Sequence, residues 1–217
     1  MKKQNDLIKN LLKTILTLSL VIIFLLSCVT VLVFIFTAAW LRTYKSFTDR
    51  EKIAEIELTP IESDTRGLDR FEVKYIQFEG TTGFEKLFFP DSEYSTNVEF
   101  EKEYTMYGDT VLIEAHTVKL PDALTLLNYK ALFKITGIEG DYIDNREKAK
   151  QLSGDERSIY DLNGGVDSTW EFIKRNESKL RIFIDTAEIS SKGKTVSDSP
   201  EKYSIFITEE GIVIDQE

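Results

Sequence analysis

The chain has 217 residues and a net charge of −10 at neutral pH, which disfavours nucleic acid and anionic lipid headgroups as partners. It contains one cysteine and one histidine, so an internal disulfide, a multi-cysteine metal site and a multi-histidine metal site are excluded. It also lacks the P-loop, dinucleotide-binding, HExxH and GxSxG motifs.

An apolar stretch at 14–41 begins with Thr14, ends with Leu41 and carries no charged residue. As a helix rising about 1.5 Å per residue, it exceeds the thickness of a bilayer hydrocarbon core, about 30 Å. It is also longer than the apolar region of a cleaved signal peptide, about 7–15 residues. Cys28 loosely resembles a lipidation site, but the apolar run continues beyond it. We therefore expect a transmembrane helix at 14–41.

The orientation of this helix rests on a weak charge bias, because basic residues lie on both of its sides. The tail at 1–13 is short and basic, and the helix resembles a signal anchor. We therefore expect a cytoplasmic tail at 1–13, a juxtamembrane linker at 42–52, and a soluble domain at 53–217 outside the cytoplasm. This single-pass arrangement predicts a protein of the cell envelope.

The soluble domain is expected to be rich in β-strands, because apolar and polar residues alternate along much of it. Ser168 and Glu171 have the spacing of a capping box and predict the start of a helix. We expect strands at about 54–60, 71–78, 84–89, 98–106, 110–119, 129–135, 180–184, 203–207 and 212–214, short helices at 144–152 and 168–176, and a polar loop at 190–200. The pattern predicts a mainly antiparallel β domain, a sandwich or an open barrel, with two short helices.

The clearest local unit is a predicted β-hairpin at 98–119. Gly108 and Asp109 suit a two-residue turn of type II′, which requires glycine at its first central position. This turn places Met106 opposite Val111, so that apolar side chains meet on one face.

The same register predicts a polar cluster on the other face of the hairpin, with Glu101 opposite His116. A solvated face is the simplest interpretation. A divalent-cation site and a general acid–base pair are the alternatives, and the first would need oxygen ligands plus one nitrogen. On a solvated face we expect nearby carboxylates to raise the pKa of His116, whereas a bound cation would need the neutral ring. The weak metal-ligand candidates are Glu99, Glu101, Glu103, Glu114 and His116.

Residues 161–167 faintly suggest a calcium loop, but Gly165 stands where a ligand is expected and Val166 stands where a glycine is expected, so a turn before the next helix is favoured. No other residue pattern predicts a cofactor.

Short motifs along the chain follow the membrane helix in a recognisable order. They are IAEI at 53–56, YGDTVLIEA at 107–115, YKALFKITG at 129–137, DTA at 185–187 and EGIV at 210–213. In this order the chain is similar to a group of uncharacterised bacterial single-pass membrane proteins, some labelled as multidrug or cation efflux-pump-like. One helix cannot line a transport path, so the resemblance implies at most an accessory subunit of an envelope transporter.

We expect a non-enzymatic, membrane-anchored interaction or scaffold module with an envelope protein as its partner. The alternatives are the accessory transporter subunit and a hydrolase-like enzyme that uses His116 with Glu101 or Glu114.

Overall fold

The computed structural model describes residues 13–32, 45–47, 50–80, 97–121, 131–143, 145–152, 154–181, 184–208 and 210–217. The chain divides into two compact units, Met1–Leu41 and Arg42–Glu217. In the first unit, the helix Lys13–Leu32 has the length and apolar composition of a membrane span, and its apolar window is not buried. It is the one such candidate in the described part of the chain.

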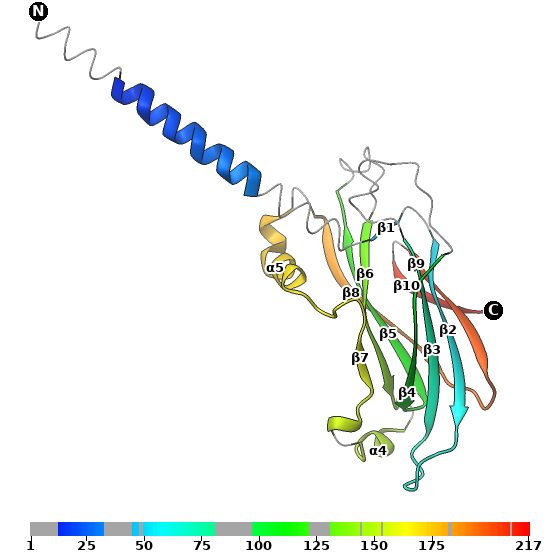
Figure 1. Ribbon diagram of the computed structural model, residues 1–217. Helices are drawn as coiled ribbons and strands as arrows, with labels where there is room; N and C mark the ends of the chain where they lie inside the picture. Colours follow the sequence, from blue (N-terminus) through cyan, green and yellow to red (C-terminus); the bar gives the residue numbers. More distant parts are fainter. Residues whose placement is uncertain are drawn as a thin grey trace, which may run out of the picture. The chain divides into compact units, whose positions relative to one another are not determined.

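The second unit is a β-sandwich of two antiparallel five-stranded sheets (Figure 1), which confirms the predicted fold class. Sheet A has the order β1-β6-β5-β8, with β7 also paired to β6, and sheet B has the order β10-β9-β2-β3-β4. The strands of sheet A are β1 (Lys45–Phe47), β5 (Thr110–Lys119), β6 (Ala131–Asp141), β7 (Ile159–Asp161) and β8 (Thr186–Thr195). Those of sheet B are β2 (Glu51–Ile61), β3 (Arg70–Phe78), β4 (Val98–Tyr107), β9 (Glu201–Thr208) and β10 (Gly211–Gln216).

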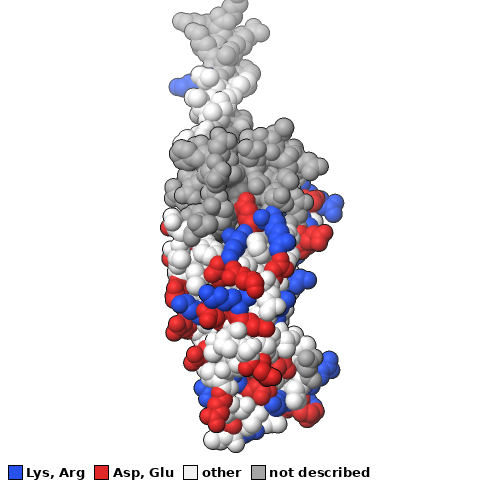
Figure 2. Space-filling view, turned by 90° about the vertical axis from the view of Figure 1, so that its right-hand side faces the viewer, with Lys and Arg blue, Asp and Glu red and all other residues white. Residues whose placement is uncertain are grey.

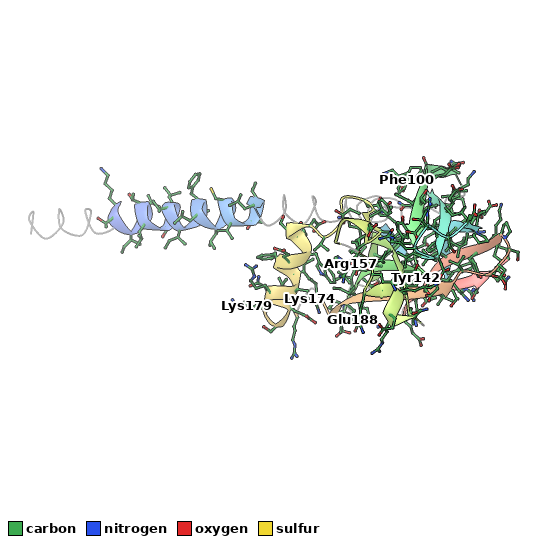
Figure 3. The ribbon with its side chains drawn as sticks, turned by 90° about the horizontal axis from the view of Figure 1, so that it is seen from below. Phe100, Tyr142, Arg157, Lys174, Lys179 and Glu188 are labelled. Atoms are coloured by element: carbon green, nitrogen blue, oxygen red, sulfur yellow. The ribbon has the colours of Figure 1, made fainter. Side chains whose placement is uncertain are left out.

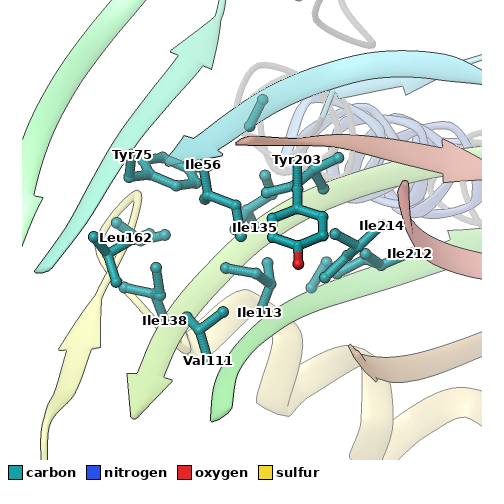
Figure 4. Close-up of a cluster of buried hydrophobic side chains, with 14 of the residues drawn as sticks. Ile56, Tyr75, Val111, Ile113, Ile135, Ile138, Leu162, Tyr203, Ile212 and Ile214 are labelled. Atoms are coloured by element: carbon teal, nitrogen blue, oxygen red, sulfur yellow. The ribbon is translucent and has the colours of Figure 1, made fainter. Parts of the chain in front are cut away.

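The hydrophobic core lies between the two sheets, where the apolar side of each strand is buried. In Figure 4, Ile56 and Tyr203 from sheet B face Ile113 and Ile135 from sheet A. Full burial of one such aliphatic side chain stabilises a fold by about 1.5–3 kcal/mol relative to exposure. The core therefore depends on strands that present one apolar and one polar side.

The predicted hairpin at 98–119 is wrong, because β4 pairs with β3 whereas β5 pairs with β6 and β8. The N–H of Gly108 donates to the backbone carbonyl of Asp69, which continues the β3–β4 ladder of sheet B. The N–H of the next residue, Asp109, donates to the backbone carbonyl of Asp141, which belongs to the β5–β6 ladder of sheet A. The chain thus steps from one sheet to the other between two consecutive residues. Met106 and Val111 both lie in the hydrophobic core, but on strands of different sheets and not paired within one sheet.

Other boundaries also differ from the expectations. The predicted linker at 42–52 contains β1 and the start of β2, and β6 continues through Gly137 and Gly140 to Asp141. The described residues of the strand expected at 180–184 are not extended into a sheet, and β8 instead occupies part of the loop expected at 190–200. The strand expected at 84–89 lies outside the described residues.

Two α-helices are present in the described part of the domain, α4 (Arg146–Ala149) and α5 (Ser168–Asn176), with single 3-10 turns η1 (Gly154–Glu156) and η2 (Glu177–Lys179). α4 is shorter than the expected helix at 144–152. α5 matches its expected bounds, but its N-cap is Asp167, one residue before the expected Ser168.

We predict that Gly108→Ala destabilises the domain by about 2–4 kcal/mol, because it adds a steric clash to an unfavourable backbone conformation. Gly108 has φ +143°, and a Cβ placed on it would lie 2.8 Å from the backbone nitrogen of Asp141. Gly67 is the matched control, since its φ is +74° but no atom lies within 4 Å of its added Cβ. Urea denaturation of the detergent-solubilised chain compares the two variants. Equal losses of stability would show that the step between the sheets tolerates a side chain.

Candidate functional site

A polar cluster lies on the outer face of sheet A, beneath α5. We call it the His116 cluster, and it comprises Glu114, His116, Lys134, Thr136, Asp167 and Trp170. Glu114 and His116 come from β5, Lys134 and Thr136 from β6, and the other two from the start of α5. Three elements that are distant in sequence therefore build one site.

The amino-terminal end of α5 is fixed to the sheet by its own cap. The Asp167 side chain accepts a hydrogen bond from the N–H of Trp170 at 2.8 Å, which satisfies one of the free donors of the first helical turn. Trp170 and Ile173 are the buried residues of this helix and lie on the side toward the sheet. The Trp170 ring stacks on His116 with 4.1 Å between centroids and 21° between planes.

A buried ion pair ties the helix to β6. The Nζ atom of Lys134 lies 2.8 Å from Oδ2 of Asp167, and the side chains are 5% and 26% exposed. Burial would raise the pKa of the Asp167 carboxyl, but the hydrogen bonds from Lys134 and from backbone N–H groups outweigh it and lower the pKa. Asp167 is therefore a charged cap that also neutralises a buried lysine.

His116 is fully buried, and neither of its ring nitrogens has a hydrogen-bond partner among the described residues. The closest carboxylate is Glu114, with 3.6 Å between Nε2 and Oε1, and Glu114 itself accepts a hydrogen bond from Thr136 at 3.0 Å. Burial lowers the pKa of His116, and Lys134 adds to this, whereas Glu114 and Asp167 oppose it. The ring is therefore neutral at pH 7. The expected raised pKa and exposed position of His116 are both wrong, because α5 covers the ring.

The structure does not bring together the five weak metal-ligand candidates. Glu99, Glu101 and Glu103 lie on β4 at the edge of sheet B, whereas Glu114 and His116 lie on β5 in sheet A. In Figure 3, Lys174 of α5 and Phe100 of β4 lie apart from each other.

No group of three or more histidine, cysteine, aspartate or glutamate side chains converges within the described ranges. Glu114 and His116 provide two ligands, fewer than the four that a structural zinc site uses.

Sequence reasoning missed a polar bridge between the two sheets. Residues 161–167 form the expected turn before α5, and within it Asn163 adopts φ 53°. The Asn163 amide donates to the Ile135 carbonyl of β6 and to the Gln77 side chain of β3, each at 3.0 Å. Gln77 in turn donates to Glu99 at 2.7 Å. The sequence Asn163-Gly164-Gly165 signalled a turn, but nothing in it identified Gln77 as the partner.

Comparisons of the chain with protein-family models, with curated proteins and with solved structures found no match.

We predict that Asp167→Asn destabilises the domain by about 3 kcal/mol, because it leaves the buried ammonium of Lys134 unpaired. Asparagine is as good an N-cap as aspartate, so the substitution removes the charge and keeps the cap. The exposed Glu171→Gln on the same helix is the control, with an expected change within about 0.5 kcal/mol. Adding Lys134→Met to Asp167→Asn should restore part of the stability in urea denaturation. No recovery in the double variant would refute the ion-pair explanation.

We also predict that the domain loses stability at mildly acidic pH because of His116. Its native pKa is lowered from 6.5, so the unfolded chain binds a proton at this residue before the native chain does. The contribution of the neutral ring is complete above 6.5 and is lost as the pH falls from there toward the native pKa. Urea midpoints at several pH values should therefore depend less on pH in His116→Gln than in the native chain. Identical pH profiles would exclude His116 as the source.

Proposed function

We propose that the chain is a membrane-anchored interaction module whose β-sandwich lies outside the cytoplasm and binds another envelope protein. The observation that carries the proposal is the apolar helix Lys13–Leu32, which joins a separate unit with its own core. A helix this apolar, with its side chains exposed, requires a non-aqueous environment.

The length of the helix supports membrane insertion. Its 20 residues would extend about 30 Å at about 1.5 Å per residue, which matches the hydrocarbon core of a bilayer. The apolar sequence continues to Leu41, so the span has residues to spare. Basic residues precede the apolar segment, and they support the proposed orientation with the sandwich outside the cytoplasm.

The charge pattern of the sandwich surface argues against binding to nucleic acid or to anionic lipid headgroups. Lysine and arginine are interspersed with aspartate and glutamate on the face in Figure 2. On sheet B, Lys52 lies 2.6 Å from both Glu55 and Glu217, and Arg50 pairs with Asp215. Such a mixed surface stays solvated and does not create the large basic field that nucleic acid requires.

The buried position of His116 argues against the hydrolase alternative. A general base must come within about 2.6–3.2 Å of the proton that it removes. The ring is covered by Trp170 and has no exposed surface, so a substrate cannot reach it while α5 stays on the sheet.

We predict that the full-length chain stays in the membrane fraction after alkaline carbonate extraction and keeps its amino-terminal segment. A reporter that works only outside the cytoplasm, fused after Glu217, should be active, whereas a reporter that works only in the cytoplasm should be inactive at the same position. The intact mass of the purified chain tests for cleavage by signal peptidase. Loss of residues 1–41 would reject the anchor, and the opposite reporter pattern would reject the orientation.

A further inference from the structure

β4, one of the two edge strands of sheet B, has a segment whose outward backbone groups have no hydrogen-bond partner among the described residues. In an antiparallel pair, residues that bond to the neighbouring strand alternate with residues whose backbone groups point away. The N–H of Gly108 donates to Asp69 in line with β3, so the even-numbered residues of β4 bond to β3. The backbone groups of the odd-numbered residues therefore point away from the sheet.

Two side-chain contacts agree with this direction and show where the edge is closed. The N–H of Tyr107 donates to Oγ of Ser158 at 3.0 Å, and the hydroxyl of Tyr160 donates to the Thr105 carbonyl at 3.1 Å. Ser158 and Tyr160 lie just before β7 and within it, so this segment covers the carboxyl-terminal part of β4.

No described residue bonds to the outward side of the stretch that precedes this covered part. The outward backbone groups of Glu101 and Glu103 have no hydrogen-bond partner among the described residues. Glu101, Lys102 and Glu103 are all exposed. An exposed strand edge of this kind can pair with an extended segment of another chain.

The charge of this edge identifies the kind of segment that fits it. Glu101 and Glu103 lie on the outer face of the sheet. Lys74 of β3 is paired in register with Glu103, but its Nζ atom lies 2.8 Å from Oε1 of Glu101. Within the described residues, Glu103 has no ion-pair partner inside 4.0 Å. The group formed by Glu101, Glu103 and Lys74 therefore carries an excess of negative charge. Opposite charges on directly paired positions stabilise strand pairing, and like charges destabilise it.

A second copy of the chain is a poor occupant for the same reason. Antiparallel pairing of this stretch with itself about Lys102 places Glu101 of one copy opposite Glu103 of the other. That arrangement sets carboxylates against carboxylates on both sides of the symmetry axis.

We propose that the open edge of β4 at Glu101–Lys102–Glu103 is the docking site for an extended segment of a partner protein that carries lysine or arginine at alternate positions. This inference rests on the proposed function and names the partner chemistry for it. The added strand forms backbone hydrogen bonds with Glu101 and Glu103, and its basic side chains lie beside the two carboxylates on the outer face.

The test uses the full chain in lipid nanodiscs and a synthetic peptide with three Lys-Val repeats, capped at both ends. Fluorescence anisotropy measures its affinity, and hydrogen exchange by NMR reports on the Glu101 and Glu103 amides. We expect slower exchange at these two amides when the peptide is present, and weaker binding of a matched Glu-Val peptide. Protection at β8 or β10 in place of β4 would overturn the proposal.

Matched variants separate docking on the edge from general attraction to an acidic protein. Glu103→Lys should weaken binding of the Lys-Val peptide at least about 5-fold more than Glu72→Lys, the same charge change on the exposed face of β3, one strand in from the edge. Glu103→Pro should abolish amide protection, since it removes an outward N–H that the sheet does not use. Circular dichroism checks that this variant folds. If it does not fold, the comparison of Glu103→Lys with Glu72→Lys alone tests whether the peptide binds at the β4 edge.

Equal weakening by Glu103→Lys and Glu72→Lys would show that the peptide responds only to the net charge of the protein, and it would reject the docking site. The proposed function fails separately, through the carbonate extraction and reporter fusions, neither of which depends on β4.

Discussion

The domain depends on the contact between two apolar sheet faces, and one short step of the chain brings these faces together. Between Gly108 and Asp109 the backbone leaves sheet B and enters sheet A. This step turns the apolar side of β5 toward that of β4 across the core. β5 lies between β6 and β8, so a conformation that kept β4 and β5 paired would remove the strand that holds sheet A together.

The position of β5 inside sheet A also determines the environment of His116. Its inner side is buried in the core, and its outer side carries Glu114 and His116. α5 covers that outer side, with Trp170 against the imidazole and Asp167 paired to Lys134. Buried polar groups of this kind stabilise a fold only when they are paired, and the His116 ring nitrogens have no hydrogen-bond partner in the part of the chain that the structure describes. The His116 cluster therefore holds α5 against sheet A, but it leaves the two ring nitrogens of His116 desolvated.

Alternation of apolar and polar residues predicted β2, β3, β4, β5, β9 and β10 to within a few residues, because each has one buried and one solvated side. The same alternation cannot distinguish two strands that pair side by side from two that face each other across a core. Both arrangements bury the same side chains, and the hairpin prediction failed for this reason. β8 was missed because it is an exposed edge strand whose burial is confined largely to Ala187.

The site was harder to predict than the strands. Period-two geometry correctly placed Glu114 and His116 on one face, but the residues that set the chemistry of His116 come from β6 and α5. A local sequence window contains no information about a helix that folds over it from 50 or so residues away. The capping residues did predict α5 itself, since its start is encoded locally.

The surfaces that remain limit how such a chain can act. The inner faces form the core, α5 covers part of sheet A, and Oγ of Ser190 bonds to the N–H of Ile212 where β8 meets β10. A short open strand edge provides few hydrogen bonds and therefore weak affinity by itself. Confinement to a membrane raises the effective concentration of two proteins anchored in it, and weak contacts then suffice. For the proposed membrane-anchored module, a small strand edge is therefore physically adequate for binding a partner anchored in the same membrane.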